Sequence, residues 1–189
     1  MSSFLNELAK PQPIPGGGGA AAQTALTGLA LLTKVIALEM VREGLSPDQQ
    51  EAWRLIDLRA RDIRKGLLRL RRQDGQAYLH WVRHRGSAVE RDYARVMTEV
   101  PDQIAARSIQ VLELIPPVGA RSKNHLKPDL LVVAELLRGA GLAAVRIASA
   151  NLSRIKDTLL RERLAGELKS RTKHISRAAQ RAALPAGGR

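Results

Sequence analysis

One charged residue, Asp74, occupies a row of otherwise apolar side chains. The row consists of Trp53, Ile56, Ala60, Ile63, Leu67, Leu70, Asp74, Ala77 and Trp81. Its steps alternate between three and four residues, which places these side chains on one side of a helix. A carboxylate removed from water favours its neutral form, so its pKa rises and it becomes a candidate acid or base near neutral pH. The alternative is that the helix breaks at Gly75 and leaves Asp74 in solvent.

A glycine run is the second candidate feature. Gly16, Gly17, Gly18 and Gly19 precede an apolar helical stretch. There they would let the backbone approach a ligand, with free N–H groups at the helix start. The run lacks the lysine of a phosphate-binding loop and the preceding strand of a dinucleotide site, and a flexible connector is the alternative.

Two polar residues near predicted helix faces and ends complete the candidates. Asn151 continues an apolar row through Ala144 and Ile147, so its amide must find partners in the protein or in a ligand. Asp129 begins a helix, where an acid also offsets the helix dipole. His80 and His84 share a helix face, but no carboxylate at helical spacing completes a zinc site, so no metal is predicted.

Helices must position all these residues, because Ala and Leu dominate and β-branched runs are scarce. We predict one all-α domain over residues 1–189, an up-and-down bundle of five to six helices, with 183–189 a frayed tail. Pro101 is expected to start or kink a helix, and residues 128–164 to form one long helix or two end to end. The long apolar row and the small-residue helices would suit a homodimer.

The charge balance is strongly basic, with a net charge of +13. Such a surface attracts polyanions, so nucleic acid, an acidic small substrate and simple solvated helix faces all remain open. The basic segment Lys169 to Arg181 lacks the aromatics expected for single-stranded nucleic acid. The absence of cysteines and of a signal-peptide pattern at the N-terminus fits a cytoplasmic protein. Residues 19–41 are expected to form a buried helix rather than a membrane span.

Four motifs in order resemble one family. FLNELAKPQPIPGGGGAAAQTALTGLALL resembles the opening of the formiminotetrahydrofolate cyclodeaminase and methenyltetrahydrofolate cyclohydrolase family. Asp74-Gly-Gln-Ala-Tyr78 is similar to the family's Asp-x-x-Ala-Tyr. Lys123-Asn124 followed by Pro128-Asp129-Leu130, and then Asn151-Leu152, resemble its later Gly-Asn, Ser-Asp-Leu and Asn-Leu motifs.

The resemblance implies a helical dimer that acts on a reduced, possibly polyglutamylated, folate and needs no further cofactor. It implies that Asp74 is the catalytic carboxylate. The substrate-binding residues that it implies are Gly16, Gly17, Gly18, Gly19, Tyr78, Lys123, Asn124, Asp129 and Asn151. Lysines and arginines would receive the glutamate tail.

The chain departs from the family pattern at three of these places. Gly19 and Pro128 stand where the family usually has serine, and Ile147 where it commonly has asparagine. Each change removes a hydrogen-bonding group from the implied site. The alternative to a folate enzyme is therefore a catalytically degenerate member that binds an anionic partner such as nucleic acid.

Overall fold

The computed structural model describes residues 2–183, and within this range it contains helices and no strand. Short α1 (Ser2–Leu8) is followed by α2 (Gly17–Met40), α3 (Pro47–Arg83), α4 (Glu90–Gly119), α5 (Lys127–Asn151) and α6 (Thr158–Ala183). Two 3₁₀ segments, η1 (Asn124–Leu126) and η2 (Leu152–Arg154), flank α5. The predicted all-α bundle of five to six helices is confirmed.

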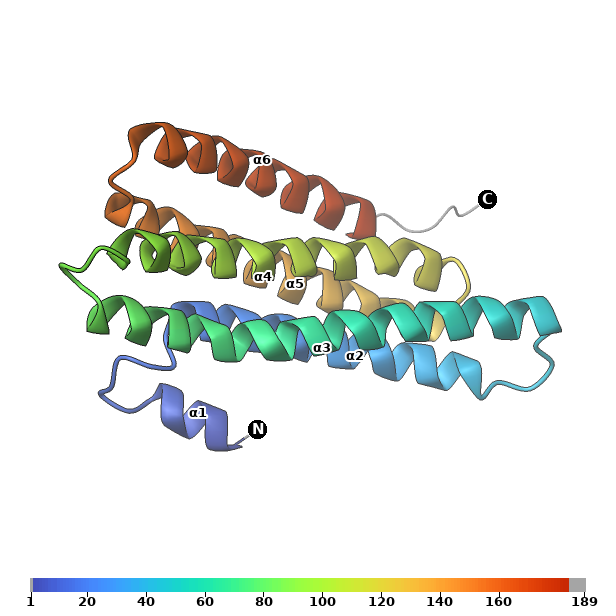
Figure 1. Ribbon diagram of the computed structural model, residues 1–189. Coiled ribbons are helices and arrows are strands. Elements are labelled where there is room, and N and C mark those ends of the chain that lie inside the picture. The colour runs from blue at the N-terminus through green and yellow to red at the C-terminus, as the bar shows by residue number, and fades with distance from the viewer. Residues whose placement is uncertain (1, 184–189) are drawn as a thin grey trace.

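The long helices α2 to α5 lie side by side, and α6 covers α4 and α5 (Figure 1). α1 lies outside the bundle, beneath the start of α2. Successive long helices run in opposite directions because each connection is short. The core between them is rich in alanine and leucine. Small residues allow close packing: a Cβ at Gly28 of α2 would lie 3.2 Å from Leu136 Cβ of α5.

α2 is long and apolar enough to cross a membrane by length and composition. Half of the most apolar 18-residue stretch of α2 is buried inside the bundle. Leu29, Leu32 and Ile36 are fully buried, which agrees with the prediction of a buried core helix.

Pro101 does not start a new helix, because α4 continues without a break from Glu90 to Gly119. A proline inside a helix removes one N–H and frees the carbonyl four residues earlier, here that of Met97. Asn151 of α5 donates its side-chain Nδ2 to that oxygen at 2.6 Å. A side chain from the neighbouring helix thus replaces the missing backbone hydrogen bond.

The prediction for residues 128–164 was wrong. α5 ends at Asn151, η2 follows, and α6 then folds back along α4 and α5 instead of continuing the line of α5. Ile155, which begins the connection to α6, is buried and fixes this turn against the bundle. The predicted tail begins where α6 ends, and residues 184–189 lie outside the described range.

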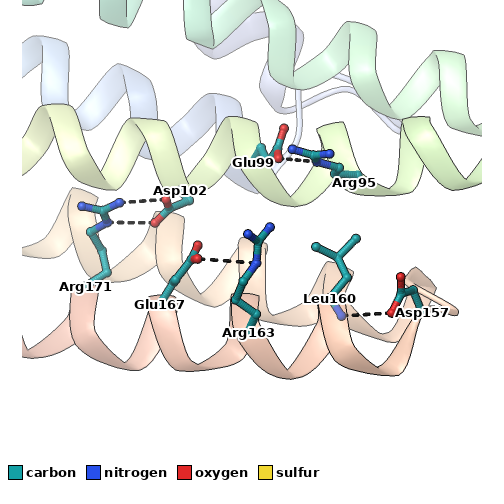
Figure 2. Close-up of polar contacts among 8 residues, drawn as sticks. All are labelled: Arg95, Glu99, Asp102, Asp157, Leu160, Arg163, Glu167 and Arg171. Carbon is teal, nitrogen blue, oxygen red and sulfur yellow. Dashed lines mark hydrogen bonds and ion pairs between the residues drawn. The ribbon is translucent and has the colours of Figure 1, made fainter.

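A bidentate ion pair links α6 to α4, in addition to the apolar side chains of α6 in the core. Arg171 of α6 donates two hydrogen bonds to Asp102 of α4, each 2.9 Å long. Figure 2 shows that this pair bridges the two helices, whereas Arg163 and Glu167 pair within α6. Paired guanidinium and carboxylate groups of this geometry are stronger than neutral hydrogen bonds.

Candidate active site

Asp74 lies in the middle of α3, which runs unbroken past Gly75 to Arg83. The alternative of a helix break at Gly75 is therefore wrong. The Asp74 side chain is half-buried and faces the first turn of α2. Its Oδ2 accepts a hydrogen bond from the backbone N–H of Gly19 at 2.8 Å.

The glycine run explains how a carboxylate fits there. Gly17 to Gly19 form the first turn of α2 instead of a loop before it. The N–H groups of a first helical turn have no partner within their own helix. Asp74 supplies an acceptor from the neighbouring helix. A Cβ at Gly18 would lie only 2.5 Å from Asp74 Cγ, so glycine at this position makes room for the carboxylate.

Two opposing effects set the acidity of Asp74. Burial is the larger and raises the pKa of its carboxyl group, because the charged form loses water. The hydrogen bond from Gly19 lowers the pKa, but by less. The balance is a raised pKa, which suits a group that must both hold and release a proton near neutral pH.

A groove of about 810 Å³ opens beside Asp74 between α1, α2 and α3. Its lining includes three arginines of α3, Arg64, Arg71 and Arg72, and Phe4 of α1. The Arg71 guanidinium lies 5.0 Å from the centre of the Phe4 ring and donates to the Gln23 side chain. None of the three arginines pairs with a carboxylate within residues 2–183. The groove therefore joins a proton-transfer group to cations that can bind an anionic ligand.

The predicted site residues fall into two groups within one chain. Gly16, Gly17, Gly18, Tyr78 and Asn151 line a small cavity together with Asp74. Gly19 lines the groove beside Asp74. The structure therefore brings these predicted residues together around the carboxylate.

The second group contains Lys123, Asn124 and Asp129. The backbone N–H of Lys123 donates to the buried Glu39 at 2.8 Å, and Asp129 lies 3.5 Å from Lys34. Along α2, Lys34 lies 15 residues after Gly19, a distance of about 22 Å. Glu39 lies 20 residues after Gly19, a distance of about 30 Å. Within one chain, the length of α2 therefore separates these three residues from the group around Asp74.

Asn151 has partners in the protein. Its Nδ2 binds the Met97 carbonyl, and its Oδ1 accepts from Arg154 at 3.1 Å. Arg64, Arg71 and Arg72 were not predicted as site residues, because in the sequence they resemble the solvated face of any basic helix. Among the described residues, no cluster of three or more His, Asp or Glu side chains could hold a metal ion, and His80 and His84 stack on Tyr93.

Residues 1–170 match the family model described as formiminotransferase-cyclodeaminase. The chain belongs to the formiminotransferase-cyclodeaminase family. The fold is similar to that of the crystal structure of formiminotetrahydrofolate cyclodeaminase from Thermotoga maritima, with a TM-score of 0.88 and 20% identity. The match covers 96% of this chain and 92% of that one. No curated protein matches the chain in sequence. Family membership supports a function of the folate-cyclodeaminase type.

Proposed function

We propose that this chain is an enzyme of one-carbon folate metabolism in which Asp74 transfers the proton. The reaction is either cyclisation of 5-formimino-tetrahydrofolate to 5,10-methenyl-tetrahydrofolate with loss of ammonia, or hydrolysis of the methenyl compound to 10-formyl-tetrahydrofolate. The observation that carries the proposal is the carboxylate itself. Gly19 holds Oδ2, and Oδ1 has no hydrogen-bond partner among the described residues.

Both reactions pass through a tetrahedral carbon bonded to nitrogen, and both need a proton delivered to, or taken from, a group on that carbon. A half-buried carboxyl group with a raised pKa can do this at neutral pH. The glycine turn lets a flat pterin approach the backbone of α2. Arg64, Arg71 and Arg72 lie where they can receive the glutamate tail, including a polyglutamate.

We further propose that the enzyme is a homodimer whose sites combine residues of two chains. The exposed face of α2 is largely apolar, with Ala30, Leu38 and Met40 accessible to solvent. Two copies of α2 packed antiparallel about their midpoints would place the start of one helix beside the end of the other. Lys123, Asn124 and Asp129 of one subunit would then approach the Asp74 groove of the second.

Absorbance of the methenyl group tests the reaction. The purified protein is given methenyl-tetrahydrofolate in one assay and 5-formimino-tetrahydrofolate in another. Loss of the signal in the first identifies a cyclohydrolase, and its appearance in the second identifies a cyclodeaminase. No change in either assay with folded protein would contradict the proposed enzyme.

Subunit mixing tests the shared site. Asp74→Asn and Asp129→Asn are each expected to be inactive alone. If each site combines both residues across the interface, random exchange of subunits restores about a quarter of wild-type activity. Recovery of no activity from mixtures that sedimentation shows to be dimers would contradict the shared site.

A polyanion-binding function is the second candidate. The net charge is +13, and Lys169, Lys173, Arg177 and Arg181 of α6 have no carboxylate partner among the described residues. Binding of this kind weakens steeply as salt rises and does not need Asp74. Folate binding is expected to depend on salt modestly and to involve the groove.

The reduced-folate substrate and the cysteine-free sequence both fit a cytoplasmic location.

A further inference from the structure

A second and smaller cavity, of about 120 Å³, adjoins Asp74. Its lining includes Tyr78 of α3, Met97 of α4, and Ile147 and Asn151 of α5. Ile14, Asp74 and Gly75 line both this cavity and the large groove. These three residues therefore form a partition between the two spaces, and the catalytic carboxyl group borders both. We call the smaller space the rear chamber.

The size of the rear chamber limits what it can hold. A water molecule occupies about 30 Å³ of liquid, so the chamber has room for a few such molecules. Sites for drug-sized ligands measure roughly 300–1,000 Å³, a range that includes the large groove and excludes the chamber. A pterin therefore fits only the groove.

The chamber also contains unused hydrogen-bonding capacity. Arg154 lines it, and the Arg154 Nε–H is buried without an acceptor in the described protein. Its Nη1 binds Asn151, and its guanidinium lies 4.9 Å from the centre of the Trp81 ring, so the side chain is held in place. A buried donor without a partner is costly unless a small molecule supplies the acceptor. Its positive charge disfavours an ammonium ion and favours a neutral molecule with a lone pair.

We propose that the rear chamber is the site of the small reactant, water or ammonia, while the folate occupies the groove. The inference rests on the proposed function. It assigns the side of Asp74 that borders the groove to the folate and the side that borders the rear chamber to the small reactant. In the cyclising direction, N10 has bonded to the former formimino carbon, and the formimino nitrogen has taken up the proton that N10 lost and become an amino group. The proton of the Asp74 carboxyl group moves to the amino group on that carbon. The C–NH₃⁺ bond breaks, its electron pair leaves with nitrogen, and neutral ammonia departs into the chamber as the methenyl cation forms.

In the hydrolytic direction, water from the chamber adds to the methenyl carbon. The Asp74 carboxylate accepts the proton that water loses as the C–O bond forms. The carboxyl group then returns a proton to N5 as the C–N5 bond breaks. The hydroxyl oxygen on the carbon forms the formyl C=O bond and releases its proton to solvent, which gives the 10-formyl product. Each reaction uses one proton-transfer group between two compartments.

Filling the chamber tests the assignment. Ile147→Phe enlarges a side chain that lines the chamber and not the groove. We expect turnover at saturating folate to fall at least about tenfold, less than the roughly 10²–10⁴-fold loss from removing the acid itself. Folate affinity, measured by calorimetry, should be unchanged. Ile56→Phe is the matched control. Ile56 of α3 is half-buried, as Ile147 of α5 is, but it lines neither cavity.

High-resolution crystal structures of the wild type and Ile147→Phe decide the question independently of activity. The wild-type chamber should hold ordered water within hydrogen-bond distance of Arg154 Nε or Asp74 Oδ1, and the variant should lack it. A dry wild-type chamber would overturn the proposal, as would full turnover in a variant whose chamber is filled. Ordered water in a protein that turns over neither folate would support the chamber while rejecting the proposed reaction.

Discussion

Asp74 serves two purposes that oppose each other. Its carboxylate accepts the Gly19 N–H and so completes the first turn of α2, a contact that favours the charged form. Its half-buried position removes water and favours the neutral form, and this effect is the larger. A residue that only capped a helix would gain nothing from burial. The raised pKa therefore reflects a position that suits proton transfer at some cost in stability.

Asp74→Asn is expected to stabilise the fold at neutral pH. The folded pKa is raised above the ordinary value of 3.8, so the folded state binds this proton more tightly than the unfolded chain does. Its contribution to stability is fully present below that ordinary value and is lost as pH rises through the folded pKa. The asparagine oxygen can still accept from Gly19. Melting temperatures should favour the variant at pH 7 and converge at acidic pH; a less stable variant at pH 7 would contradict this account.

Gly18→Ala should disturb the site directly. The added methyl group would overlap the Asp74 carboxylate, which must move, and overpacking of this kind costs about 1–3 kcal/mol. Gly139→Ala is the control, because a Cβ at Gly139 of α5 would meet nothing within 4 Å and Gly139 lines neither cavity. The free energy of unfolding in urea and the turnover should both fall in Gly18→Ala and should not fall in Gly139→Ala. Equal behaviour of the two variants would remove the steric argument.

Among the elements, α4 and α5 are coupled through an exchanged hydrogen bond. Pro101 leaves the Met97 carbonyl without its helical partner, and Asn151 provides the replacement. The same contact fixes the end of α5 beside the rear chamber. A proline inside a helix and a polar residue in an apolar row, each unfavourable alone, compensate for one another.

A double-mutant cycle measures this compensation. Asn151→Ala leaves the Met97 oxygen buried and unpaired, at a cost of about 1–3 kcal/mol in the free energy of unfolding. Pro101→Ala restores an N–H four residues after Met97. In that background Asn151→Ala should cost about 1 kcal/mol less. Additive effects in urea unfolding would show that the two residues act separately.

Arg171 and Asp102 add an ion pair to the apolar packing that holds α6 on the bundle. Both side chains are partly buried and the pair is bidentate, so a double-mutant cycle should give a coupling of about 1 kcal/mol. Arg163 and Glu167 lie 3.8 Å apart and are exposed, and their cycle should give no measurable coupling. Neither pair lines the groove, so folate turnover should remain normal in all these variants. Similar coupling for the two pairs would contradict the distinction.

At the scale of the whole molecule, periodicity was sufficient to predict an all-helical bundle and the inward position of Asp74. It was insufficient where tertiary contacts override local rules. Asn151 of α5 stabilises α4 where Pro101 interrupts its backbone hydrogen bonds, and the buried Ile155 fixes the turn into α6. Order along the chain also could not show that Lys123, Asn124 and Asp129 lie at the opposite end of α2 from Asp74. That separation depends on helix length and packing direction, and it motivates the proposed dimer.

The most direct test of the central claim compares the wild type with Asp74→Asn in the methenyl-tetrahydrofolate absorbance assay, with folate affinity measured in parallel. Removal of the proton-transfer group should lower turnover by roughly 10²–10⁴-fold while the arginine-lined groove still binds the folate. In the cyclising direction, where the acid form of Asp74 donates the proton, wild-type turnover should also fall as pH rises above the raised pKa of Asp74. Unchanged turnover in Asp74→Asn, with intact binding and fold, would contradict the account.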